Sequence, residues 1–266
     1  MKNHMFDLFQ VCLDAGKEIL DVYAQDFDVE FKEDDSPPLT LADKRAHQAI
    51  ESGLARIDSS IPVLSEEGRA IPYGERKRWK QFWLVDPLDG TKEFVKKNGG
   101  EFTVNIALID DKYCIGGVIY APPALDTFYF GEQGQGAYKL ERASEQEITK
   151  LDDLLEKSIL LPSVKDKDAI HVVASRSHMS KETEDFINEL DGNVDVVSSG
   201  SSLKFCLVAE GKADYYPRYA PTMEWDTGAG QAIVEASGGS VTRHEDGERF
   251  YYNREELLNG WFLAKR

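Results

Sequence analysis

One stretch, WLVDPLDGTKEF at residues 83–94, constrains the fold of this chain more than any other. Its apolar start predicts a buried strand that delivers two carboxylates, Asp86 and Asp89, to its carboxyl end. Pro87 cannot donate a ladder hydrogen bond, so the strand is expected to stop there. Gly90 permits an unusual backbone angle or the close approach of a ligand, and residues 91–94 resemble the first turn of a helix.

Two interpretations of this stretch are open. Carboxylate oxygens beside the N–H groups of a helix start suit Mg²⁺ bound together with a phosphate ester. A plain strand-to-helix turn explains the same residues, with Asp as a cap and Gly relieving backbone strain. Motifs elsewhere in the chain decide between the two.

Composition limits the class of partner. The chain has 266 residues and is 41% hydrophobic, so it can bury a substantial core in one large domain or two moderate ones. It carries 31 Lys and Arg against 48 Asp and Glu, a formal net charge of −17, which argues against a nucleic-acid or anionic-membrane surface. A small anionic substrate fits only if cations or a local basic cluster neutralise it.

The cysteines and the apolar runs indicate the compartment. Cys12, Cys114 and Cys206 lie far apart in apolar surroundings, with no CxxC or zinc-type spacing, as expected in a reducing cytoplasm. No apolar run approaches the length of a transmembrane segment. We therefore predict a cytoplasmic location without a membrane span, and leave peripheral attachment to the inner face of the membrane open.

Two acidic motifs precede the central stretch. Asp43 follows Thr40 at the spacing of a capping box, so it caps a helix, reaches an active site, or does both. Glu66 and Glu67 follow a short apolar strand. Because neighbours in an extended segment face opposite ways, only one of the two can face a given site.

A further acidic motif lies near the C-terminus. Asp226 stands near the start of a helix of small residues, where it is either a plain N-cap or a ligand. Serines at 199–202 open another predicted helix, and they could cap that helix or donate to an anion.

The order of the elements predicts an α+β fold. Apolar periodicity predicts one helix at 5–24 and a second helix that follows Asp43 and ends at residue 57. Predicted strands with short turns at 101–140 indicate an antiparallel meander. Residues 69–81, with basic residues at 76–78, are expected to form an exposed connection. We expect an N-terminal α+β domain at 1–150 with most metal ligands, and a C-terminal α/β domain at 151–266 that contributes Asp226 and the nucleotide contacts.

Three separated motifs together resemble the inositol monophosphatase superfamily over nearly the whole chain. They are Glu66 in Ser65-Glu66-Glu67, the segment DPLDGT from Asp86 to Thr91, and Trp225-Asp226 followed by a small-residue helix and Gly238-Gly239. The resemblance implies a layered α-β-α-β-α sandwich and a Mg²⁺-dependent, lithium-sensitive phosphatase. The three motifs together favour the metal interpretation of Asp86 and Asp89 over the plain turn.

Within the superfamily, the sequence is most similar to the 3′(2′),5′-bisphosphate nucleotidase branch. The carriers of this similarity are Lys92-Glu93-Phe94 after the Gly-Thr pair, Ser175 to His178, Ser201 to Lys204, and Tyr216-Pro217-Arg218. The similarity implies hydrolysis of the 3′-phosphate of adenosine 3′,5′-bisphosphate, a by-product of sulfate activation, to AMP and phosphate. The sulfated precursor of that nucleotide is a further candidate substrate.

The resemblance also implies roles for single residues. Two or three Mg²⁺ ions would be held by Glu66, Asp86, Asp89, Asp226 and the Leu88 carbonyl. Of these residues, Glu66, Leu88, Asp89 and Asp226 would also contact the substrate. Thr91, with Asp43 or Glu66, would orient and deprotonate the attacking water. The N–H groups of Gly90 and Thr91 would hold the phosphate, and the nucleotide with its second phosphate would meet His178, Ser201, Lys204 and Arg218.

Three alternatives stay open from the sequence. The chain could be an inositol monophosphatase or a sugar bisphosphate phosphatase of the same fold, or a non-catalytic regulatory protein on that fold. Both a monomer and a homodimer are compatible with the sequence.

Overall fold

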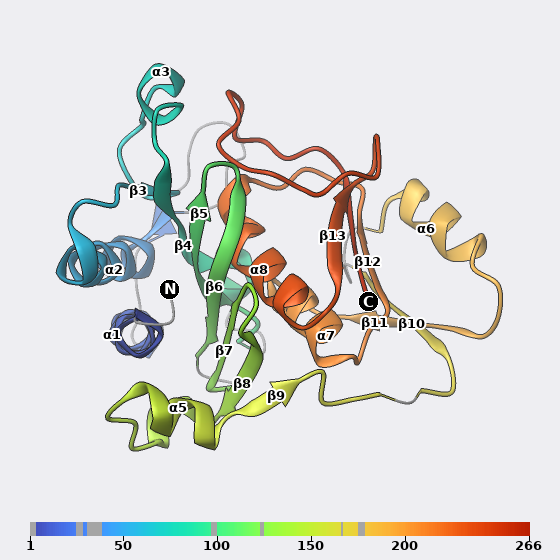
Figure 1. The fold of residues 1–266 in the computed structure, drawn as a ribbon, viewed down its shortest axis with the longest axis horizontal. Helices are drawn as coiled ribbons and strands as arrows, with labels where there is room; N and C mark the ends of the chain where they lie inside the picture. The colour runs from blue at the N-terminus through green and yellow to red at the C-terminus, as the bar shows by residue number, and fades with distance from the viewer. Residues whose placement is uncertain are drawn as a thin grey trace.

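Two large β-sheets and three layers of helices form the bulk of the structure, a computed structural model that describes residues 4–24, 29–30, 39–96, 100–122, 125–165, 167–174 and 179–266. Helices α1 (Met5–Tyr23) and α2 (Leu41–Asp58) cover the outer face of a seven-stranded sheet. Helices α7 (Leu203–Glu210) and α8 (Gly228–Ala236) lie between this sheet and a five-stranded one, and α6 (Lys181–Asn188) lies on the far side (Figure 1). The predicted α+β fold and its α-β-α-β-α layering are confirmed.

The seven-stranded sheet contains the predicted meander. Its order is β3 (Val63–Ser65), β4 (Gln81–Asp89), β5 (Thr103–Asp110), β6 (Tyr113–Ala121), β7 (Thr127–Glu132), β8 (Gly136–Glu141) and β9 (Ile159–Leu161). All neighbours are antiparallel except β3 and β4, which are parallel. The short helices α3 (Tyr73–Arg76), α4 (Thr91–Lys96) and α5 (Leu151–Lys157) and the 3₁₀ turn η2 (Ala143–Glu145) connect these strands.

The five-stranded sheet is mixed. Its order is β11 (Val194–Ser198), β10 (Ile170–Ala174), β12 (Tyr215–Arg218), β14 (Phe262–Lys265) and β13 (Ser240–Arg243). Strand β10 is parallel to both of its neighbours, whereas β14 is antiparallel to β12 and β13. A separate antiparallel pair joins β1 (Val29–Glu30) to β2 (Leu39–Thr40).

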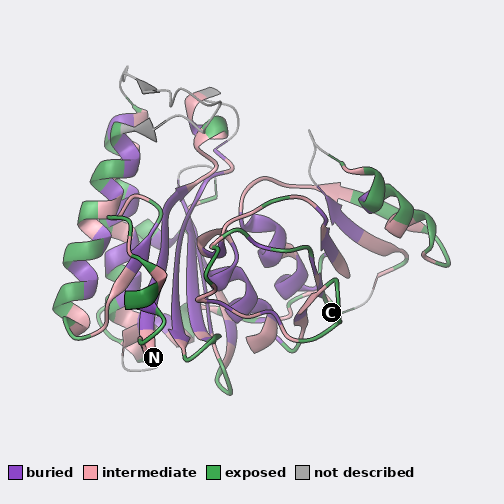
Figure 2. Cartoon of the chain, turned by 90° about the horizontal axis from the view of Figure 1, so that it is seen from above, coloured by how far each residue is buried: buried purple, intermediate pink, exposed green. Residues whose placement is uncertain are grey.

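Burial of both faces explains the composition of the central strands. The side chains of residues 103–109 in β5 are all buried, including the polar Thr103 and Asn105. Figure 2 shows the central strands of the sheet in the colour of buried residues. One face of the sheet packs against α1 and α2, and the other packs against α7, α8 and the second sheet. A strand covered on both faces needs no exposed polar side, so its polar residues are available for internal hydrogen bonds.

The segment predicted as a linker, residues 141–168, makes contacts in both halves of the chain. Strand β9 belongs to the seven-stranded sheet, although it follows residue 150. The backbone N–H groups of Ser163 and Val164 then donate to the carbonyl oxygen of Glu210 at the end of α7. The division into domains 1–150 and 151–266 stays a prediction.

Helix α8 approaches the seven-stranded sheet closely enough to require glycine. A Cβ atom at Gly117 in β6 would lie 2.7 Å from the Cα atom of Ala229 and 2.8 Å from its carbonyl oxygen. Both atoms belong to the helix backbone, which cannot move aside as a flexible side chain could. Gly117 therefore sets the distance of α8 from the sheet.

We predict that Gly117→Ala lowers the free energy of unfolding by about 1–3 kcal/mol, because the added methyl group overpacks this contact. Gly74→Ala in α3 is the matched control, since a Cβ atom there would meet nothing within 4 Å. Urea midpoints measure both variants. Equal midpoints for Gly117→Ala and the parent protein would contradict the account of this interface.

Candidate active site

The parallel pairing of β3 and β4 brings two acidic residues together. Ser65 pairs with Val85, so Glu66, directly after β3, and Asp86, within β4, follow side by side. The Glu66 backbone N–H donates to the Val85 carbonyl oxygen at 3.2 Å, which extends the pairing to the residue itself. Ordinary parallel pairing of two short apolar strands thus places a glutamate beside an aspartate.

Asp226 reaches the same point from the second half of the chain. It ends the 3₁₀ turn η3 (Glu224–Asp226), which leads directly into α8 between the two sheets. The carboxylate groups of Glu66, Asp86 and Asp226 each offer an oxygen, and these oxygens lie within 4.8 Å of one another. Three hard oxygen donors at this separation form a candidate site for a divalent cation.

Crowding disfavours the charged forms of these carboxylates. Burial raises the pKa of Asp86 well above its usual range, and the charges of Glu66 and Asp89 raise it further. Burial, followed by the charge of Asp89, raises the pKa of Asp226 to about 7. The Glu66 side chain keeps an exposed side, yet desolvation of its carboxyl group and the charge of Asp226 raise its pKa to about 8. Carboxylates that repel one another in this way need cations to be ionised together.

The end of β4 differs from the prediction at Pro87. The strand continues to Asp89, and its register with β5 shifts between Asp86, which pairs with Asn105, and Asp89, which pairs with Thr103. Pro87 and Leu88 therefore oppose a single residue of β5, which is a β-bulge, and a bulge accommodates a residue without an N–H. The bulge lets β4 carry both aspartates within the strand.

A tight turn holds Asp89 against α7. Gly90 has a φ of +97°, and a Cβ atom there would collide with the Ser201 hydroxyl. That hydroxyl donates to the carbonyl oxygens of Asp89 at 3.0 Å and of Glu101 at 2.7 Å. The Ser202 backbone N–H donates to the Asp89 carboxylate. The predicted contact of Ser201 with substrate stays a prediction, because its hydroxyl holds this turn together.

Helix α4 starts at Thr91, as predicted, and has six residues. The Thr91 hydroxyl donates to the Leu88 carbonyl oxygen at 3.3 Å, so these two predicted site groups are adjacent. Asp43 is buried in the first turn of α2, and its charge contributes to the raised pKa of Glu66. Asp43 is therefore near the cluster, while its cap function is not described, because the Thr40 side chain lies outside the described residues.

Two basic residues face the acidic cluster. Lys204 in α7 is 7% exposed, and its Nζ donates to the carbonyl oxygens of Ser201 at 2.8 Å and Ser199 at 3.3 Å. Burial lowers the pKa of Lys204 to about 8, while the charge of Asp89 opposes that shift. Arg218 at the end of β12 donates to the Pro221 carbonyl oxygen at 3.0 Å, and in the part of the chain that the structure describes its buried Nε has no hydrogen-bond partner. His178, predicted to meet the nucleotide, lies outside the described residues.

Asp226 caps its own 3₁₀ turn rather than α8. Its Oδ2 accepts the Met223 N–H at 2.8 Å, and Thr227 is the residue that precedes α8. The interpretation of Asp226 as the plain N-cap of α8 is therefore wrong, because Asp226 belongs to the preceding turn and the helix starts one residue later than that interpretation requires.

Sequence reasoning assigned no role to Thr103 and Asn105, two polar residues that meet Ser202 behind Asp89. The Ser202 hydroxyl donates to the Asn105 Oδ1 at 2.6 Å and lies 2.8 Å from the Thr103 hydroxyl. All three side chains are buried. The signal that could have found them is Asn105, a polar residue in an apolar strand directly opposite Asp86.

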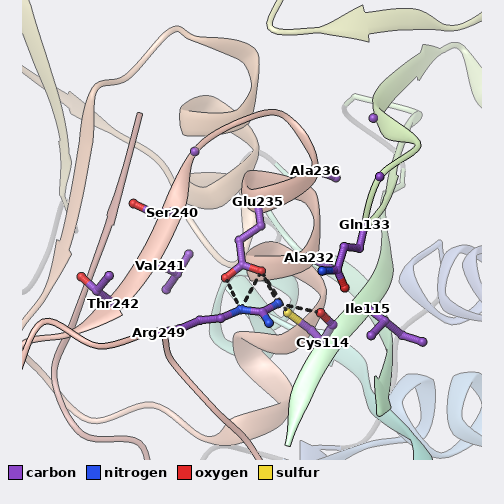
Figure 3. Close-up of a pocket in the computed structure, with 13 residues that line it drawn as sticks. Cys114, Ile115, Gln133, Ala232, Glu235, Ala236, Ser240, Val241, Thr242 and Arg249 are labelled. Atoms are coloured by element: carbon purple, nitrogen blue, oxygen red, sulfur yellow. Dashed lines mark hydrogen bonds and ion pairs between the residues drawn. The ribbon is translucent and has the colours of Figure 1, made fainter.

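A cavity of about 420 Å³ opens at the other end of α8. Its lining includes Glu235 and Arg249, which form a two-pronged ion pair with distances of 2.6 Å and 3.1 Å (Figure 3). The cavity lies beyond the C-terminal half of the helix, whereas Asp226 precedes its N-terminus. The two sites are thus separate.

Comparison with known proteins identifies the family. The sequence profile described as "Inositol monophosphatase family" matches residues 2–265. The chain belongs to this family. Enzymes of the family are metal-dependent and generally use Mg²⁺, which agrees with the donor set of the carboxylate cluster.

Individual relatives are similar over almost their full length. The "3′(2′),5′-bisphosphate nucleotidase CysQ" of Salmonella typhimurium is 44% identical over 255 residues, covering 95% of this chain and 96% of the relative. The protein of the same name from Escherichia coli K12 is 44% identical over 257 residues, with the same coverage. The crystal structure of CysQ from Bacteroides thetaiotaomicron has 48% identity and a TM-score of 0.87, covering 99% of this chain and 96% of that one.

None of the helices within the described ranges combines the length and the apolar character needed to cross a bilayer.

We predict that Asp226→Asn lowers turnover by at least about 100-fold, since even outer partners of metal ligands typically contribute 10- to 100-fold. Without metal the variant should melt at the same temperature as the parent or higher, because one repelling charge is gone. The stabilisation by Mg²⁺ should be lost. Thermal melts in EDTA and in Mg²⁺ measure this, with Asp195→Asn on exposed β11 as the control. An undiminished rise in melting temperature on adding Mg²⁺ to Asp226→Asn would contradict the assignment.

Proposed function

We propose that the chain is a Mg²⁺-dependent 3′(2′),5′-bisphosphate nucleotidase. It removes the 3′-phosphate of adenosine 3′,5′-bisphosphate, giving AMP and phosphate, and it takes the sulfated precursor as a further substrate. The observation that carries the proposal is the meeting of Glu66, Asp86 and Asp226 with two basic residues, Lys204 and Arg218, beside them. The relatives named as nucleotidases, at 44% identity, support the choice of substrate.

The donor set fits two or three Mg²⁺ ions. Glu66, Asp86, Asp89, Asp226 and the Leu88 carbonyl offer only oxygen atoms, which favour Mg²⁺ over softer metals. When bound, the ions would neutralise the carboxylates, activate water and stabilise the leaving oxygen of the ester. Because the crowding of these carboxyl groups raises their pKa values, bound cations would favour the ionised forms.

The residues of the chain position water and phosphate. Thr91, whose hydroxyl already touches the Leu88 carbonyl, orients the attacking water with Asp43 or Glu66 as the proton acceptor. The backbone N–H groups of Gly90 and Thr91 hold the phosphate in line with that water. Gly90 is required for this, because its backbone angle and the nearby Ser201 hydroxyl leave no room for a side chain.

The basic residues provide the preference for a bisphosphate. A substrate with a second phosphate needs charge neutralisation that the acidic cluster cannot give. Arg218 has a buried Nε without a partner among the described residues. Lys204 is near enough for the positive charge of Arg218 to help lower its pKa, so an anion between the two would relieve their repulsion. We propose that these two bind the second phosphate, with Ser201 and His178 completing the nucleotide contacts.

We also propose a cytoplasmic location and leave the oligomeric state as a monomer or a homodimer. The three cysteines are unpaired and buried, as expected in a reducing cytoplasm. Either a monomer or a homodimer is compatible with the function, because every residue proposed for the site comes from one chain.

We predict strong release of phosphate from adenosine 3′,5′-bisphosphate with Mg²⁺, little from inositol 1-phosphate, and none from either in EDTA. A malachite-green assay with both substrates side by side measures this. Preference for the inositol ester would be compatible with the proposed metal site but would contradict the proposed nucleotide substrate. No release from either ester would favour a regulatory protein on the same fold.

We predict that Arg218→Ala raises KM for adenosine 3′,5′-bisphosphate by about 10- to 100-fold, since a charged hydrogen bond is worth about 1.5–3 kcal/mol. Hydrolysis of adenosine 3′-monophosphate, which lacks the second phosphate, should change little. Arg249→Ala at the distant cavity is the matched control. An equal rise in KM for both nucleotides would show that Arg218 does not bind the second phosphate.

A further inference from the structure

The turn that carries Asp226 is built onto a segment near the C-terminus. The Glu224 N–H donates to the Leu257 carbonyl oxygen at 2.9 Å, and the Asn259 N–H donates to the Thr222 carbonyl oxygen at 2.8 Å. Residues 222–224 thus pair with residues 257–259 outside either sheet. The position of Asp226 therefore depends on a loop that sequence reasoning left without a function.

Glu224 is the centre of this pairing. Its side chain is 0% exposed, and it accepts the Asn253 N–H at 2.8 Å, the Arg254 N–H at 3.0 Å and the Arg254 Nε at 3.0 Å. A buried carboxylate with three donors is fully engaged, so its removal leaves the Arg254 Nε and two backbone N–H groups without their acceptor. Glu224 lies two residues from Asp226 and cannot reach substrate from this position.

Asn259 holds the other side of the turn. Its Nδ2 lies 2.7 Å from the Met223 carbonyl oxygen and 3.1 Å from the Thr227 hydroxyl, and its Oδ1 accepts a hydrogen bond from Arg254. The Thr227 hydroxyl in turn donates to the Glu224 carbonyl oxygen at 3.0 Å. The residues before and after the turn are both fixed by one amide group.

The same network orients the Asp226 carboxylate. The Met223 N–H donates to the Asp226 Oδ2 at 2.8 Å, and the Met223 carbonyl accepts from Asn259. One peptide segment therefore connects the amide of Asn259 to the carboxylate of Asp226. Movement of the 253–259 segment would shift this oxygen relative to the other ligands.

Arg76 ties the network to the other half of the site. Arg76 is 3% exposed, and its guanidinium donates to the Asn253 Oδ1 at 3.1 Å and the Glu255 carbonyl oxygen at 2.7 Å. Its helix, α3, lies in the chain between β3, which precedes Glu66, and β4, which carries Asp86. The network thus spans both halves that must meet around a cation.

We propose that Glu224, Arg254 and Asn259 are positioning residues that set the affinity of the site for Mg²⁺ by holding Asp226 against Glu66 and Asp86. This inference rests on the proposed metal site, and it does not depend on which phosphate ester is the substrate. None of the three residues contacts the reacting atoms.

The test compares two charge-neutralising variants of the same type. Glu224→Gln disrupts the network at its ion pair with Arg254. Glu235→Gln disrupts a second glutamate–arginine pair, Glu235 with Arg249, at the far end of α8 (Figure 3). Calorimetric titration of the substrate-free protein measures the Kd for Mg²⁺. Nucleotide KM and kcat at saturating Mg²⁺ are the second readout, and the melting temperature reports stability.

We expect Glu224→Gln to raise the Kd for Mg²⁺ by about 10- to 100-fold, as outer partners of metal ligands typically do. KM and kcat at saturating Mg²⁺ should stay near the parent values, and Glu235→Gln should bind Mg²⁺ as the parent does. An unchanged Kd in Glu224→Gln, or equal weakening in both variants, would overturn the proposal. Absence of Mg²⁺ binding in the parent itself would instead overturn the metal site and the proposed function.

A second variant keeps the test decisive if Glu224→Gln does not fold. Asn259→Asp preserves the size of the side chain and the acceptor for Arg254 but removes the amide donor to Met223. We expect the same weakening of Mg²⁺ binding, and parent-like binding by a folded Asn259→Asp would contradict the proposal.

Discussion

Mutual repulsion of closely spaced carboxylates is the constraint on which the rest of this structure depends. Glu66, Asp86 and Asp226 present oxygens within 4.8 Å of one another, and Asp89 adds its charge from the same strand as Asp86. Such an arrangement is unfavourable without cations, so the fold must hold it in place by other means. The packing of two sheets, the bulge in β4 and the polar network under Asp226 all serve that requirement.

Helix α8 links the two sheets to the turn that carries Asp226. The helix starts beside the carboxylate cluster and ends at the Glu235–Arg249 ion pair. Its nine residues, at 1.5 Å per residue, give it a length of about 13 Å. Gly117 lets it approach the first sheet, while β13 and β14 contact it from the second. Because a single rigid element touches both sheets, its N-terminal end has a fixed position relative to β3 and β4. The 253–259 segment then supplies the finer orientation of Asp226.

Local patterns in the sequence predicted an α+β fold and the candidate acidic residues, whereas the layering and the meeting of those residues were implied by the family resemblance. Apolar strands ending in Asp or Glu, and small residues after Asp226, are visible without tertiary contacts. The bulge at Pro87 was not predictable, because it depends on the register of β5. Arg76 lay in a stretch expected to be exposed, yet it is 3% exposed, since its partners at 253–255 are far away in sequence. Glu224 and Asn259 resemble ordinary surface residues for the same reason.

The central claim is that carboxylates from both halves of the chain bind the same metal. Anomalous diffraction from crystals soaked in Mn²⁺, which accepts the same oxygen ligands as Mg²⁺, tests it most directly. The account predicts a strong anomalous peak in contact with Glu66, Asp86 and Asp226. A peak bound by residues of one half alone, or no peak at this cluster, would contradict it.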